Sequence, residues 1–196
     1  MKIGIMGGVF DPIHFGHFQA AEGAKSEIGL EKVLFIPSGI PPHKPKPLAD
    51  KEDRFKMLKF CLKNNKQFIP LKLEIKKEGY SYTIDTIKEI KAIYGEDNDY
   101  YFIIGSDTIP ELGKWKDINE LFKIIKFVAV SREGFEIKVR RRERKLESQN
   151  IIFIKFPTLN VSSSFIRERI KNGLSIKYLV PDKVEKYIEE KGLYKF

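Results

Sequence analysis

The sequence has few of the residues that build disulfide frameworks or zinc sites. Its 196 residues include one cysteine, Cys61, and three histidines. A single cysteine cannot form an internal disulfide, which favours a reducing compartment. No Cys, Asp or Glu lies near the histidines at the spacing of zinc ligands, so we expect no metal site built by the protein itself.

Long hydrophobic runs are also missing. No apolar run approaches the length that crosses a bilayer, and we expect no membrane association. The apolar run at residues 2–6 breaks at Gly7 and Gly8, which makes it too short and wrongly flanked for an export signal. These absences predict a cytoplasmic protein.

Acidic residues are outnumbered by basic ones. Lys and Arg total 36 against 27 Asp and Glu, a net charge of +9. Residues 138–145 hold six bases and one acid, so part of the excess is local. A surplus of this size favours an anionic partner such as a nucleotide, a nucleic acid or an acidic surface. The basic segment itself fits a solvated helix face or a contact with nucleic acid or a partner.

Short apolar runs alternate with longer amphipathic segments. We expect a helix from Asp50 onward, with Asp53 as the partner in a capping-box-like start. The strands are expected at residues 2–6, 32–36, 70–75, 100–104, 126–130 and 151–154. The other helices are expected at 17–28, 81–94, 117–123, 135–148, 163–172 and 181–191.

This alternation is typical of the α/β class, and it predicts a Rossmann-like doubly wound parallel sheet with flanking helices. With 42% hydrophobic residues, a chain of this length is expected to be one domain over residues 1–196, with a small C-terminal helical part at about 160–196. Ligands of such sheets lie beyond the carboxyl ends of the strands. Loops that follow strands are therefore the places to search for a site.

The loop after the first strand is the most informative segment. It reads GGVFDPIHFGH over residues 7–17 and holds two of the three histidines. We expect Gly7 and Gly8 to let the backbone turn sharply and let an anion approach, and we interpret Asp11 followed by Pro12 as a turn. His14 and His17, three residues apart, should share one side of the first helical turn. Two imidazoles at a helix N-terminus indicate a phosphate site.

The segment resembles the HxGH nucleotidyltransferase superfamily, and within it the bacterial nicotinate-nucleotide adenylyltransferases. Further segments carry the resemblance: PPHK at 41–44, SYTIDT at 81–86, IGSD at 104–107 followed by Trp115, and VSSSFIR at 161–167. Three positions depart from the family pattern. Val9 stands where a hydroxyl residue is usual, Ser164 replaces Thr, and Ser106 stands where Ala is frequent.

The resemblance implies that AMP passes from ATP to nicotinate mononucleotide, with pyrophosphate released. It implies catalysis by His14 and His17, and Mg²⁺ that arrives with ATP. Lys44 would bind the phosphate of the mononucleotide, Thr83 would read its ring carboxylate, and Trp115 would stack on its pyridine ring. The ATP-binding set implied by the resemblance is Gly7, Gly8, Phe10, His14, His17, Gly105, Asp107, Ser163 and Arg167.

Simpler interpretations stay open for several of these residues. Lys44 also fits a solvated surface lysine, Thr83 an ordinary helix start, and Trp115 a core side chain. The alternative functions are a related adenylyltransferase acting on nicotinamide mononucleotide or phosphopantetheine, and a basic RNA-binding module. The sequence shows no RNA-binding signature, so we expect ATP and nicotinate mononucleotide as partners and no nucleic acid. It leaves a homo-oligomer open.

Overall fold

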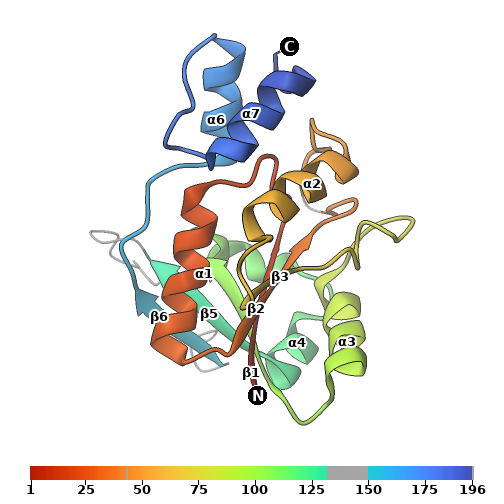
Figure 1. Cartoon of the computed structure of the whole chain (residues 1–196). Helices are drawn as coiled ribbons and strands as arrows, with labels where there is room; N and C mark the ends of the chain where they lie inside the picture. The colour runs from red at the N-terminus through yellow and green to blue at the C-terminus, as the bar shows by residue number, and fades with distance from the viewer. Residues whose placement is uncertain (43, 132–149, 196) are drawn as a thin grey trace.

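One parallel sheet organises the molecule (Figure 1). The computed structural model describes residues 1–42, 44–131 and 150–195. Within them the strand order is β3-β2-β1-β4-β5-β6, and every neighbouring pair is parallel. The strands are β1 (Lys2–Gly8), β2 (Lys32–Pro37), β3 (Phe68–Pro70), β4 (Asp99–Gly105), β5 (Lys126–Ser131) and β6 (Ile151–Lys155). The order reverses between β1 and β4, which confirms the Rossmann-like doubly wound sheet.

Helices cover both faces of this sheet. They are α1 (Phe15–Ile28), α2 (Lys51–Leu62), α3 (Thr83–Tyr94), the 3-10 helix η1 (Ser106–Lys114), α4 (Ile118–Ile124), α6 (Ser163–Lys171) and α7 (Asp182–Lys191). The apolar residues of α1, α2, α6 and α7 share one core cluster, and those of α3, α4 and η1 share the other. Strand side chains alternate between the two clusters: Ile5 belongs to the second and Met6 to the first.

The sequence explains where several helices start. The Asp50 carboxylate accepts a hydrogen bond from the Glu52 N–H at 2.8 Å, and Ser162 Oγ accepts one from the Phe165 N–H at 3.1 Å. Both are ordinary N-caps. The expected capping partner at Asp53 is wrong, because its carboxylate instead accepts a hydrogen bond from the Tyr187 hydroxyl at 2.7 Å. That contact ties α2 to α7.

Two expected elements need correction, and one falls outside the described residues. The strand expected at 70–75 ends at Pro70, and the last hydrogen bond of its pairing with β2 is donated by the Leu71 N–H to the Phe35 carbonyl at 2.9 Å. The following residues form turns, with Lys76 N–H donating to Lys72 O at 3.2 Å. No element was expected at 106–114, where η1 lies. The expected basic helix at 135–148 lies outside the described residues.

The C-terminal helices lie beyond the carboxyl edge of the sheet (Figure 1). Besides the Tyr187–Asp53 contact, the Tyr194 hydroxyl donates to Asp11 Oδ1 at 2.8 Å. Because α7 and the residues after it pack on α2 and on the first loop, we propose that residues 1–196 form one domain. Among the described helices, none is both long and apolar enough to span a membrane.

Candidate functional site

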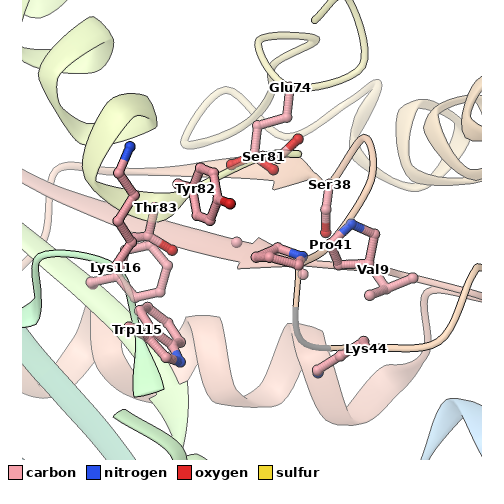
Figure 2. Close-up of a pocket in the computed structure, with 14 residues that line it drawn as sticks. Val9, Ser38, Pro41, Lys44, Glu74, Ser81, Tyr82, Thr83, Trp115 and Lys116 are labelled. Carbon is pink, nitrogen blue, oxygen red and sulfur yellow. The ribbon is translucent and has the colours of Figure 1, made fainter. Parts of the chain in front are cut away.

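A pocket of about 140 Å³ opens at the carboxyl ends of β1 and β2 (Figure 2). Its walls come from β1, from the loop after β2, from the start of α3 and from the segment after η1. The predicted site residues Gly7, Gly8, Lys44, Thr83 and Trp115 all line it. The other lining residues are Val9, Ser38, Pro41, Pro42, Glu74, Ser81, Tyr82, Phe102 and Lys116. The remaining predicted residues lie outside the pocket wall.

Gly7 and Gly8 serve close packing and not a turn, which corrects the sequence-based expectation. Both belong to the extended strand β1. A Cβ on Gly7 would lie 3.0 Å from Cζ of Phe102, and one on Gly8 would lie 3.0 Å from Cε1 of Phe10. The chain turns at Phe10 instead, where φ is 50°. Phe10 is buried, and its side chain belongs to the first core cluster.

His14 and His17 lie side by side at the N-terminus of α1. Their ring centroids are 3.7 Å apart and the planes are tilted by 30°. The backbone N–H of His14 donates to Nδ1 of His17 at 3.3 Å. Since Nδ1 accepts, a neutral His17 carries its proton on Nε2. That proton is the one His17 can donate to a ligand.

The electrostatic surroundings of His17 keep its ring neutral. Burial lowers its pKa well below the ordinary value of 6.5, and the neighbouring charges of His14 and Lys44 lower it further. Lys44 is an exposed residue of the loop after β2 that lines the pocket, and its charge also acts on His17, so it lies near both the pocket and the histidine pair. An anion placed there would meet both groups.

Thr83 and Trp115 form the far side of the pocket. Thr83 is the first residue of α3, whose first N–H groups have no partner within the helix. Such a helix start attracts anions. Trp115 is half-buried, and its ring packs edge-on against Phe102 at 5.6 Å and Phe127 at 6.2 Å. The tryptophan therefore belongs to the core and to the pocket wall at once.

The start of α6 packs against the loop after β1. Arg167 donates through Nη1 to the Asp11 carbonyl at 2.7 Å and through Nη2 to Ser164 Oγ at 3.2 Å. Ser163 Oγ donates to the Pro12 carbonyl at 2.9 Å. A serine hydroxyl has one proton, so in this arrangement Ser163 cannot also donate to a phosphate. Ser163 and Arg167 thus lie beside the histidine loop, residues 7–17, and do not line the pocket.

Gly105 and Asp107 lie where β4 passes into η1. The Asp107 carboxylate folds back over the Cα of Gly105, so a Cβ at this position would force that exposed side chain to move. Asp107 itself is exposed at the first turn of η1. The two residues lie at the carboxyl end of β4, the strand next to β1 across the reversal of strand order.

Asp11 joins four parts of the chain. From the sequence alone it was interpreted only as a turn residue. Its side chain is 3% exposed and accepts hydrogen bonds from the N–H groups of Leu48 and Ala49 at 2.8 and 3.0 Å. Tyr194 donates to the same carboxylate, and Nη1 of Arg167 lies 3.9 Å from it. The loops after β1 and β2 and the C-terminal segments are held together here.

Arg54 is a second residue that sequence reasoning missed. It is 1% exposed, although arginines on helices are usually solvated. Its Nη1 donates to the carbonyl of Val9 at 2.6 Å, and its Nη2 donates to those of Ser38 and Gly39 at 2.7 and 3.3 Å. Burial lowers its pKa, and the charge of Asp11 opposes that effect most strongly. Nothing in the spacing of α2 sets this arginine apart from a surface one.

A buried carboxylate completes the pocket. Glu74 is 8% exposed and accepts a hydrogen bond from Thr86 Oγ1 at 2.7 Å. Burial raises its pKa, and the Thr86 hydrogen bond and the charge of Lys77 partly offset this. Among the described residues, no group of three or more His, Cys, Asp and Glu is placed to hold a metal ion.

Comparisons with known proteins agree with this geometry. The chain matches the cytidylyltransferase-like family over residues 5–169. It is 47% identical to a probable nicotinate-nucleotide adenylyltransferase of Thermoanaerobacter sp. (strain X514), over 100% of this chain and 95% of that protein. A protein of the same description from Dictyoglomus thermophilum is 40% identical, over 99% of this chain and 100% of its own length.

A solved structure shares the fold. It is the nicotinic acid mononucleotide adenylyltransferase of Plasmodium falciparum complexed with NaAD, with a TM-score of 0.79, 22% identity and coverage of 100% of this chain and 98% of that one. At 22% identity, this similarity supports a shared fold only.

Proposed function

The chain belongs to the cytidylyltransferase-like family, and from this membership we propose that it is a nicotinate-nucleotide adenylyltransferase. It joins the AMP part of ATP to nicotinate mononucleotide and yields nicotinate adenine dinucleotide and pyrophosphate, a step of NAD biosynthesis. The relatives that are 40–47% identical over nearly their full length carry the same description. We expect it to act in the cytoplasm, and a homo-oligomer remains open.

The pocket is the observation that carries the proposal. It combines an aromatic face on Trp115, the start of α3 at Thr83 and the ammonium of Lys44 in one recess beside the histidine pair. A planar acidic ring suits the aromatic face and the helix start. A phosphate suits Lys44 as a point charge. These are the two ends of nicotinate mononucleotide.

The reaction needs two anions brought together. A phosphate oxygen of the mononucleotide attacks the α-phosphorus of ATP, and the bond from that phosphorus to the bridging oxygen of the β-phosphate breaks. No covalent enzyme intermediate is required, so positioning and charge stabilisation supply the catalysis. In our proposal His14 and His17 contact the phosphates of ATP. His17 donates from Nε2, the nitrogen that its contact with the His14 backbone leaves protonated.

The other predicted residues complete the part of the site that we assign to ATP. Gly7, Gly8 and the backbone at Phe10 give the nucleotide a close approach to β1, and Gly105 and Asp107 meet its ribose at the end of β4. We assign Arg167 and the start of α6 to the phosphates of ATP, and the contact between Arg167 and the Asp11 carbonyl of the loop after β1 supports this assignment. Val9 lacks the hydroxyl usual at its position, but its carbonyl still binds Arg54.

Nucleotidyltransferases that act on ATP generally use a divalent metal, and we propose Mg²⁺. The loop at residues 7–17 offers two imidazoles, which are poor ligands for Mg²⁺ and good partners for phosphate. Its one carboxylate, Asp11, is buried and already accepts hydrogen bonds from Leu48, Ala49 and Tyr194. The metal would therefore be held by phosphate oxygens and water, and when bound it neutralises charge on the phosphates.

Pyrophosphate release tests the proposal. The enzyme is given ATP and Mg²⁺ with nicotinate mononucleotide, nicotinamide mononucleotide or phosphopantetheine in separate reactions. We expect the nicotinate substrate to give the highest kcat/KM. Release only with phosphopantetheine, or no release with any of the three, would contradict the proposal.

A further inference from the structure

Two lysines line the pocket, and they lie on different sides of it. Figure 2 shows Lys44 on the loop after β2 and Lys116 beside Trp115 and Thr83. The proposed substrate is also charged at both ends, with a phosphate at one and a ring carboxylate at the other. One cation has been assigned to the phosphate. The second has no role in the proposal so far.

The histidine pair decides which lysine faces which end. The mononucleotide phosphate must reach the α-phosphorus of ATP beside His14 and His17. Lys44 lies on that side, since its charge acts on His17. The ring must then extend away from the histidines, toward the aromatic face of Trp115. Lys116, the residue after that tryptophan, lies on the side where the ring substituent ends up.

The Lys116 ammonium is held over the start of α3. Its Nζ lies 4.6 Å from the ring centroid of Tyr82 and 3.4 Å from Oδ2 of Asp85. Tyr82 is the N-cap of α3 and Asp85 lies in its first turn. The cation and the positive end of the helix therefore act on the same volume. Asp85 neutralises part of this charge, and the side chain of Lys116 is still 44% exposed.

We propose that Lys116 is a specificity-determining residue that selects an anionic ring substituent over a neutral one on the pyridine ring. This inference rests on the proposed function. Backbone N–H groups and the Thr83 hydroxyl fix the orientation of either substituent by hydrogen bonds. Lys116 adds an attraction that a carboxylate feels and a carboxamide does not, because only the carboxylate carries a net charge.

The test compares two substrates in one charge-removing variant. Lys116→Met keeps the length of the side chain and removes its charge. We expect kcat/KM for nicotinate mononucleotide to fall about tenfold, mainly through KM, because exposure to water and Asp85 weaken the attraction. For nicotinamide mononucleotide kcat/KM should stay within about twofold. Lys116→Arg should restore most of the preference.

A matched control lies two residues earlier. Lys114 is exposed and pairs with Glu111 at 2.7 Å, and it does not line the pocket. Lys114→Met changes the net charge equally and should leave the substrate ratio unchanged. Asp85→Asn removes the carboxylate that competes for Lys116, so it should raise the preference for the acid.

The outcomes separate this inference from the proposed function. A wild-type enzyme that releases no pyrophosphate with either mononucleotide overturns both. Suppose instead that the wild-type enzyme prefers the acid, but Lys116→Met lowers kcat/KM equally for both mononucleotides or for neither. The lysine is then only a structural part of the pocket wall. An equal loss of substrate preference in Lys114→Met would also overturn the inference, because the net charge of the protein would then explain the preference.

Discussion

Replacing Arg54 by methionine should damage both the stability and the substrate pocket of the enzyme. The guanidinium group bridges the loop after β1, through the Val9 carbonyl, to the loop after β2, through those of Ser38 and Gly39. Val9 and Ser38 both line the pocket. Methionine keeps the apolar stem but leaves these carbonyls without their donor.

The expected loss follows from the two short hydrogen bonds, at 2.6 and 2.7 Å. A buried acceptor left without a donor costs about 1–3 kcal/mol, so two of them give about 2–6 kcal/mol. The variant also avoids the cost of burying a cation. However, it removes a positive charge that stabilises the buried Asp11 carboxylate. We expect a net loss of about 3 kcal/mol in the free energy of unfolding.

Urea denaturation measures this loss, and steady-state kinetics measure its effect on the pocket. At a slope of about 2–3 kcal/mol per M of urea, the midpoint should fall by about 1 M or more. KM for the mononucleotide should rise in the folded variant. Lys56→Met, an exposed change on the same helix, is the control. A loss below about 1 kcal/mol together with an unchanged KM would refute the bridging role of Arg54.

Three other predictions concern the charged groups. His17→Ala should lower kcat by about 10²–10³-fold in a folded enzyme with a smaller change in ATP affinity, and near-normal turnover would contradict its catalytic role. Lys44→Ala should raise KM for the mononucleotide more than for ATP, and Arg167→Ala should do the reverse; identical patterns would mean that the two cations share one phosphate. Because the pKa of His17 is lowered in the folded state from 6.5, the unfolded chain binds a proton there that the folded enzyme does not. Stability should therefore fall as the pH drops below about 6.5, and His17→Gln should weaken that dependence in pH-dependent thermal unfolding, whereas an unaltered profile would contradict the neutral state of His17.

The sheet could be predicted because each strand has a recognisable local pattern in the sequence. Buried parallel strands are short apolar runs, and the alternation with amphipathic segments fixes their class. The one misplaced strand, expected at 70–75, shows the limit of this argument: Leu73 and Ile75 alternate as in a strand, but the chain leaves β2 after Leu71 and forms turns. The pocket residues Lys44, Thr83 and Trp115 could be named in advance because each lies in a short motif that resembles the family's pattern, and all three line the pocket.

Arg54, Asp11 and Lys116 could not be assigned because their roles depend on distant parts of the chain. Arg54 looks like any solvated arginine of an amphipathic helix until its three carbonyl partners are in place. Asp11 was visible only as a turn residue, since its donors lie near residue 48 and at Tyr194. Lys116 is one of many lysines, and only the folding of α3 beside it brings Tyr82 and Asp85 into contact.

The contact between Tyr194 and Asp11 has a consequence for biosynthesis. The two residues are 183 positions apart in the chain. At about 5–20 residues per second on the ribosome, roughly 10 to 40 s separate the translation of the two codons. During that interval the histidine loop is already made but lacks the tyrosine that closes it. The nascent chain should therefore acquire the final form of the loop that holds Asp11, His14 and His17 only after Tyr194 leaves the exit tunnel.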